Sequence, residues 1–194
     1  MDIMEKIHLP LGRYRIGLQA IDEISFRGYS GSAWRGLFGH ALKRTVCVTR
    51  ESHCSGCMLY HSCVYSWIFE TPPPEDSKIM CRYPAVPHPF VLSPEFSLRK
   101  TPVGKPIDIG LTLVGKANQY LPYVIEAFRR MGEQGIGPSK SRFKLIQVKQ
   151  KIDLLQGNWQ ALYENGRLQK SADPQTPKLL AWYIVRKTDL IKRD

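Results

Sequence analysis

His40 and Lys43 lie three positions apart, and their types and spacing point more directly to chemistry on a phosphate than any other pair in the chain. Apolar residues around them recur at helical spacing, which predicts an amphipathic helix from Ser32 to Val46. Because a helix advances about 100° per residue, Gly36, His40 and Lys43 should share the face opposite the apolar stripe. An imidazole, an ammonium group and bare backbone would then lie together.

These residue types suit cleavage of RNA by its own 2′-hydroxyl, which needs a base, an acid and a cation but no metal. Imidazole titrates closest to neutral pH, so His40 fits either proton-transfer role. Lys43 would stabilise the charge that develops on the phosphate, and Tyr29 would orient the hydroxyl or donate a proton. The alternative makes His40 a surface or packing histidine, Lys43 a plain phosphate contact or solvated charge, and Tyr29 a cap or core residue.

Gly36 and Gly39 both fall in the interior of this helix. A glycine there costs roughly 1 kcal/mol relative to alanine, which indicates close approach of another backbone. That backbone is either a nucleic acid or a packed segment of the same fold.

The formal net charge of +11, from 28 Lys and Arg against 17 Asp and Glu, favours a polyanionic partner such as RNA or DNA. Arg35 and Arg44 on the helix are predicted RNA contacts. A second set of predicted contacts comprises Gly135, Gly137, Lys140 and Arg142, because glycines leave backbone N–H groups free for phosphate. A tight turn between a helix and a strand is the alternative for that loop.

Four cysteines are clustered in a polar segment that cannot form a core of its own: Cys47, Cys54, Cys57 and Cys63. The C-x-x-C spacing of the central pair lets two thiolates bind one ion, which predicts a structural zinc site. His53 or His61 could replace one thiol, and Cys81 is a distant fifth ligand. An iron-sulfur cluster also takes four thiolates, and the remaining alternative is ordinary loop and core cysteines.

The order of predicted elements indicates an α+β protein with a ferredoxin-like (RRM-like) antiparallel sheet, two helices and a cysteine-rich, proline-rich insert at 47–106. Strands are expected at 14–26, 65–70, 107–114 and 142–148, with a short one at 90–92. The second helix is expected to have Asn118 as its N-cap and to stop at Gly132. Residues 1–156 would form this RNA-binding domain. Residues 157–194 would hold a hairpin turning at Asn165-Gly166, a linker and the first strand, 179–185, of a truncated second domain.

No secretory signal and no apolar run of membrane-spanning length occurs in the sequence. Five cysteines are too few for a disulfide scaffold in a chain of 194 residues. We therefore expect a cytoplasmic protein that does not bind membranes.

Several motifs, in this order between about residues 9 and 150, carry a resemblance to a known family: Tyr29–Leu42, the cysteine cluster, Tyr83-Pro84, Pro87–Leu92, Gly115–Asn118, Tyr120–Tyr123, Met131-Gly132 and Gly135–Gly137. They resemble the CRISPR-associated endoribonucleases of the RAMP superfamily, which cut repeat RNA. The resemblance implies two tandem ferredoxin-like domains that bind precursor CRISPR RNA and cleave each repeat without a metal, yielding guide RNA for antiviral defence.

From this resemblance we expect the chain to represent the first of those domains, without the second domain and its terminal glycine-rich loop. We expect the parent protein to be a hydrolase, and this fragment to bind repeat RNA weakly and cleave it slowly or not at all. Such domains also occur fused to a reverse transcriptase and integrase. A non-catalytic RNA-binding scaffold, within a larger CRISPR assembly or such a fusion, is the other function left open.

Overall fold

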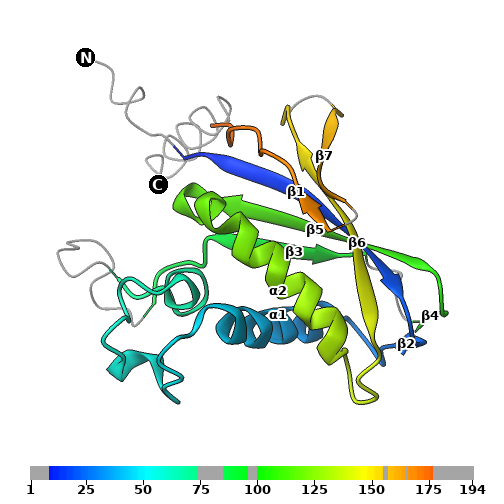
Figure 1. Ribbon diagram of the computed structural model, residues 1–194, viewed down its shortest axis with the longest axis horizontal. Helices are drawn as coiled ribbons and strands as arrows, with labels where there is room; N and C mark the ends of the chain where they lie inside the picture. The colour runs from blue at the N-terminus through cyan, green and yellow to red at the C-terminus, as the bar shows by residue number, and fades with distance from the viewer. Residues whose placement is uncertain (1–8, 74–84, 96–99, 155–156, 165, 177–194) are drawn as a thin grey trace, which may run out of the picture.

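The computed structural model describes residues 9–73, 85–95, 100–154, 157–164 and 166–176 (Figure 1). A six-stranded sheet runs through the molecule in the order β3-β5-β1-β6-β7-β8, with every neighbouring pair antiparallel. Its strands are β1 (Leu11–Ala20), β3 (Phe90–Pro94), β5 (Pro106–Val114), β6 (Phe143–Lys151), β7 (Trp159–Glu164) and β8 (Arg167–Leu168). A separate pair joins β2 (Ile24–Ser25) to β4 (Lys100–Thr101).

Two helices, α1 (Gly31–Val46) and α2 (Leu121–Gln134), lie on one face of the sheet (Figure 1). Alternate residues of β1 are buried beneath them, from Tyr14 to Ala20. Phe38 of α1 joins the layers, since its ring centroid lies 5.3 Å from that of Phe90 and 5.5 Å from that of Phe128. This arrangement confirms the α+β class predicted from the order of elements.

The strand expected at 65–70 was wrong, because Ser66–Glu70 forms a helical turn. Tyr65 and Phe69 are four positions apart, which puts both rings on one side of a helix. The rings stack with centroids 5.6 Å apart. Aromatic content suggested a strand, but packing of this aromatic pair decides the local structure.

Gly132 does not end the second helix but lies inside α2, which continues to Gln134. A β-carbon at this position would lie 2.1 Å from the carbonyl oxygen of Phe143. The glycine is therefore needed for close contact between α2 and β6.

Asn118 lies in a 3₁₀ segment, Gly115–Tyr120, that precedes α2. The Tyr14 hydroxyl donates to Asn118 Oδ1 at 3.0 Å. The Asn118 amide nitrogen donates to the carbonyls of Leu113 and Gly115 at 3.2 and 2.9 Å. Asn118 thus ties β1 to the end of β5 instead of serving as a helix cap.

The hairpin formed by β7 and β8 extends the main sheet, because β7 pairs with β6. Asn165 of its turn and the strand expected at 179–185 fall outside the described residues. Within the part of the chain that the structure describes, no helix is long and apolar enough to cross a membrane.

Candidate nucleic-acid interface and cysteine cavity

The outward face of α1 carries residues four positions apart, all exposed: Ser32, Gly36, His40 and Arg44. A β-carbon at Gly36 would meet nothing within 4 Å. Bare backbone therefore lies one turn before His40, as the sequence predicts. The cation one turn after His40 on this face is Arg44, a predicted RNA contact.

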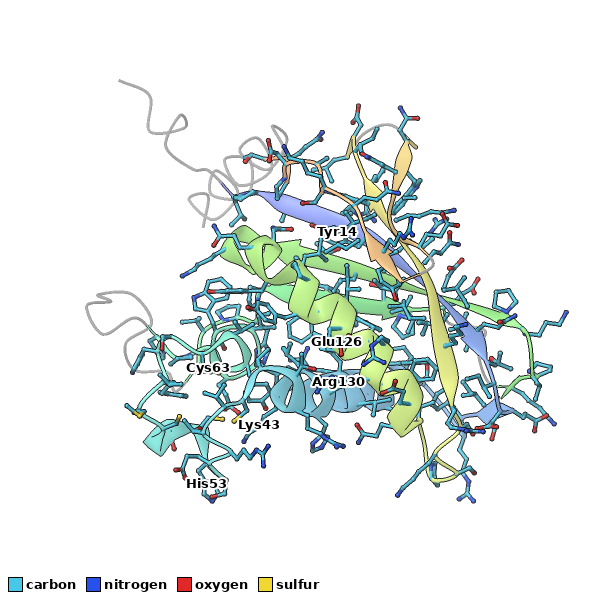
Figure 2. The ribbon with its side chains drawn as sticks, viewed as in Figure 1. Tyr14, Lys43, His53, Cys63, Glu126 and Arg130 are labelled. Atoms are coloured by element: carbon cyan, nitrogen blue, oxygen red, sulfur yellow. The ribbon has the colours of Figure 1, made fainter. Side chains whose placement is uncertain are left out.

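Lys43 points away from this face and towards the cysteine segment. Its Nζ donates to the carbonyl of Ser52 at 3.2 Å and lies 5.7 Å from the centroid of the Tyr65 ring. Figure 2 shows Lys43 at the C-terminal end of α1, on the side of the cysteine segment. Lys43 and Cys63 line one cavity. Lys43 and His40 therefore project towards different surroundings.

Tyr29 lies at the opposite end of α1 from His40. Its side chain is 61% exposed, and its ring covers Gly31, where a β-carbon would lie 2.3 Å from the ring. Since a helix rises about 1.5 Å per residue, Gly31 and His40 are about 13 Å apart along the axis. The structure does not bring Tyr29 together with His40.

Arg35 packs against two aromatic rings, with its guanidinium 5.2 Å from the centroid of Phe69 and 4.7 Å from that of Phe90. Gly39, one turn later, faces the same Phe69 ring: a β-carbon there would lie 2.6 Å from Phe69 Cζ. Packing within the fold therefore accounts for Gly39, whereas Gly36 has no such neighbour.

His88 is exposed beside this aromatic group, with its ring centroid 5.9 Å from that of Phe69. Partial burial, followed by the nearby charge of Arg35, lowers the pKa of His88. Its imidazole is therefore biased towards the neutral form.

A groove of about 510 Å³ separates the C-terminal half of α1 from the end of α2, and it contains arginines that the sequence reasoning missed. It is lined by Ala41, Arg44, Arg129, Arg130, Glu133 and Gln134. Arg130 also donates to the main-chain carbonyl of Arg44 at 3.3 Å. The groove thus places more cationic groups next to the outward face of α1.

Glu126 holds both α2 arginines at the edge of this groove, at 2.8 Å each (Figure 2 labels Glu126 and Arg130). Hydrogen bonds from Arg129 in particular lower the pKa of Glu126 to about 2. Glu133 pairs with Arg129 as well. The spacing of three and four positions between these residues was the available signal in the sequence.

The loop after α2 is a tight turn in which Ile136 and Ser141 exchange main-chain hydrogen bonds. Gly135 is required there, because its φ is +78° and a β-carbon would lie 2.1 Å from the Lys140 carbonyl oxygen. Gly137 and Lys140 are exposed. Arg142 is held by Asp22 at 3.0 Å, which lowers the pKa of that carboxyl.

All four clustered cysteines line one cavity of about 240 Å³ at the end of α1, together with Lys43 and Tyr65. Each thiol is partly buried. The amide of Leu59 donates to Cys57 Sγ at 3.4 Å, and the amide of Cys57 donates to the Cys54 carbonyl at 3.0 Å. Burial is the main factor that raises the pKa of Cys54.

No group of three His, Cys, Asp or Glu side chains that could hold a metal ion occurs among the described residues. The cysteines thus share a cavity without reaching ligand geometry. His53 and His61 are both exposed, and Cys81 falls outside the described residues.

A family model described as AF_1859_N, N-terminal domain, matches residues 9–176. The chain belongs to this family. The matched range ends after the β7–β8 hairpin and so includes the whole six-stranded sheet.

An uncharacterized protein of Archaeoglobus fulgidus is 24% identical over 124 residues, which make up 64% of this chain and 41% of that relative. The chain thus spans less than half the length of the relative. Among solved structures, a chain of the Csm3-Csm4 subcomplex of the type III-A CRISPR-Cas interference complex matches at 11% identity with a TM-score of 0.46, covering 93% of this chain and 98% of that one.

Proposed function

We propose that this chain is the RNA-binding first domain of a CRISPR-associated endoribonuclease of the RAMP superfamily. The outward face of α1 carries the proposal: an exposed imidazole, His40, lies between bare backbone at Gly36 and the exposed Arg44. The groove beside this face is lined by Arg44, Arg129, Arg130 and Glu133. The ordered motifs that resemble the family support the same assignment. Other CRISPR-associated proteins are the expected protein partners.

The connectivity supports a ferredoxin-like arrangement for the domain. Along the chain the main elements follow the order β1-α1-β3-β5-α2-β6, and in the sheet they follow the order β3-β5-β1-β6. That is a doubled β-α-β unit with all neighbours antiparallel and both helices on one face. The β7–β8 hairpin is an addition to this unit.

The reaction would use the substrate's own 2′-hydroxyl. Its oxygen forms a bond to the adjacent phosphorus while the bond from phosphorus to the 5′-oxygen breaks. One proton leaves the 2′-hydroxyl and one joins the 5′-oxygen, which gives a 2′,3′-cyclic phosphate and a free 5′-hydroxyl. His40 would carry one of these protons, and Arg44 would replace Lys43 as the cation that stabilises the charged phosphate.

A non-catalytic RNA-binding scaffold is the second candidate function. It is favoured by the distance between Tyr29 and His40 and by the direction of Lys43, which together leave His40 without the partners that the sequence suggested. In that case the same basic face would hold RNA without cutting it.

We also propose that Cys47, Cys54, Cys57 and Cys63 bind a structural zinc ion. The shared cavity and the Leu59 amide, which would stabilise a Cys57 thiolate, support this assignment. Such an ion would cross-link the segment after α1, and a closed site with four thiolates has no open position for catalysis. An iron-sulfur cluster remains the alternative occupant of the same thiols.

Incubation of labelled CRISPR repeat RNA with the full-length protein in the presence of a chelator tests the enzymatic proposal. Cleavage with a 2′,3′-cyclic phosphate end is expected, and His40→Ala should slow it by about 100-fold or more. His88→Ala is the matched control and should cut at the normal rate. RNA binding without cleavage by the unmodified protein would favour the scaffold, and His40→Ala cleavage at the normal rate would exclude His40 from the reaction.

A further inference from the structure

The face of the sheet turned away from the helices carries a row of cations on β1 and β6 that form no ion pair among the described residues. Along β1, Arg13 and Arg15 are exposed, while Tyr14 and Ile16, which alternate with them, are buried on the side of the helices. Arg15 pairs directly with Lys149 of β6 on one side and with Gly110 of β5 on the other. Figure 1 shows β1 and β6 side by side at the centre of the sheet.

Like charges directly opposite each other on neighbouring strands are destabilising. None of the ion pairs found among the described residues involves Arg13, Arg15, Lys144 or Lys149. Lys144 pairs with Gln19 further along the same face. The fold therefore accepts an unfavourable arrangement that an anionic ligand would relieve.

Trp159 of β7 adds an aromatic surface next to this row. The Arg15 guanidinium lies 4.7 Å from the centroid of the Trp159 ring. Both residues border a hollow of about 380 Å³ with Arg13, Ser93, Gly110 and Thr112. An aromatic ring beside cations on a flat surface is the combination that binds single-stranded nucleic acids, because bases stack on the ring while phosphates contact the cations.

Gly110 leaves the centre of this face without a side chain. Glycine weakens a strand interior and often marks a site where a ligand approaches closely. A β-carbon at position 110 would lie 3.3 Å from the Ser93 β-carbon, so packing in the fold disfavours a side chain only mildly. Two carboxylates, Glu95 and Asp108, border the same hollow and would direct a polyanion towards β1 and β6.

We propose that Arg13, Arg15, Lys149 and Trp159 form a second binding surface for single-stranded RNA, on the side of the sheet opposite the outward face of α1. The proposal rests on the proposed function for the identity of the ligand as RNA. It does not depend on His40 or on cleavage. A strand of RNA would contact β1, β6 and β7 through its phosphates and place a base on Trp159.

Fluorescence anisotropy of the 194-residue chain with labelled oligouridine, at two salt concentrations, tests this surface. Arg15→Ala/Lys149→Ala should lower the affinity about tenfold or more at low salt. The slope of log affinity against log salt concentration should become shallower by about 1.4, because each of the two lost phosphate contacts contributes about 0.7. Trp159→Leu should lower the affinity about fivefold or more for oligouridine and leave binding of a duplex of equal length unchanged.

The matched control is Lys105→Ala/Lys170→Ala, which removes the same charge from exposed positions elsewhere. All variants should keep the circular dichroism spectrum of the unmodified chain and none should melt at a lower temperature; Arg15→Ala/Lys149→Ala should melt at the same temperature or higher, because it removes two opposed like charges. Equal affinity and slope for the two double variants would overturn the proposal. Polyglutamate that binds as well as oligouridine, with the same loss in Arg15→Ala/Lys149→Ala, would also overturn it and assign the face to an acidic protein.

Arg44→Ala separates this proposal from the proposed function. If Arg44→Ala weakens RNA binding and Arg15→Ala/Lys149→Ala does not, only the second surface fails. If the unmodified chain binds no RNA, both proposals fail.

Discussion

The ring of Phe69 occupies the space that a side chain at Gly39 would enter: a β-carbon there would lie 2.6 Å from Phe69 Cζ. The helical turn at Ser66–Glu70 therefore depends on glycine at this position of α1 to pack closely. Arg35 and Lys43, one turn on either side of Gly39, lie over Phe69 and Tyr65 and complete the contact.

Gly39→Ala should therefore destabilise the chain, by about 1–3 kcal/mol, because the added carbon overpacks a closed contact. Gly36→Ala is the matched control on the same helix, and it should stabilise the chain by up to about 1 kcal/mol, since nothing lies within 4 Å. Urea denaturation measures both free energies of unfolding. If both substitutions changed the free energy of unfolding in the same direction, contact with Phe69 would not be what requires glycine at position 39.

Removal of one metal-binding thiol should loosen the segment after α1. Cys54→Ser or Cys57→Ser is expected to release zinc, which elemental analysis should find at one equivalent in the unmodified chain. Ser55→Ala, an exposed change between the two cysteines, should keep the metal. If the analysis finds iron with labile sulfide instead, the thiols hold an iron-sulfur cluster. Free thiols with no metal would refute both the zinc site and the cluster.

Stability should fall in acid partly through Glu126. Its pKa is lowered in the folded chain from 4.5 to about 2, mainly by Arg129, so its stabilising effect is present above pH 4.5 and is lost as the pH falls towards 2. Glu126→Gln should cost below about 1 kcal/mol at pH 7, given that the pairs are half-exposed. The difference from the unmodified chain should shrink near pH 2.

Glu133→Gln is the control for that experiment, because Glu133 is 65% exposed and contacts Arg129 alone among the described ion pairs. It should have a smaller effect at pH 7. A Glu126→Gln variant whose deficit is constant from pH 7 to pH 2 would show that the arginine pairs do not depend on ionisation of this carboxyl.

Asn118→Ala should cost about 2–3 kcal/mol, because it leaves the Leu113 and Gly115 carbonyls and the Tyr14 hydroxyl without their partner. Tyr14→Phe should cost less, because it removes one bond and leaves the Asn118 amide paired. A double-mutant cycle by urea denaturation should give a clear coupling between the two positions. Independent effects would contradict the hydrogen bond as the connection between β1 and the 3₁₀ segment Gly115–Tyr120.

The sequence was sufficient for β1, β5, β6 and the two helices, because alternation in β5 and the apolar stripes of α1 and α2 are local signals. It did not show that β3 and the β7–β8 hairpin join the same sheet. It failed at 65–70, where aromatic residues favour either a strand or a helix. Stacking of Phe69 on Tyr65, together with its contact with Gly39, decides between them. Likewise Gly132 suggested the end of the second helix, but its role is close contact with Phe143, which is distant in sequence.

The same limit applies to the candidate site. Helical spacing predicted correctly that Gly36 and His40 share an exposed face. Lys43 leaves that face because its ammonium group contacts the Ser52 carbonyl and the Tyr65 ring in the cysteine segment. The pairing of Arg15 with Lys149 joins strands more than a hundred positions apart. Register across a sheet is set by tertiary pairing, so no local pattern could reveal that row of cations.

Photo-crosslinking tests most directly whether the outward face of α1 binds RNA. Repeat RNA that contains 4-thiouridine is crosslinked to the 194-residue chain, which is then digested with trypsin and analysed by mass spectrometry. We expect an adduct on the peptide 36–43, which contains Gly36 and His40, and loss of that adduct in excess unlabelled repeat RNA. No adduct on this peptide, with crosslinks confined to other parts of the chain, would contradict the central claim.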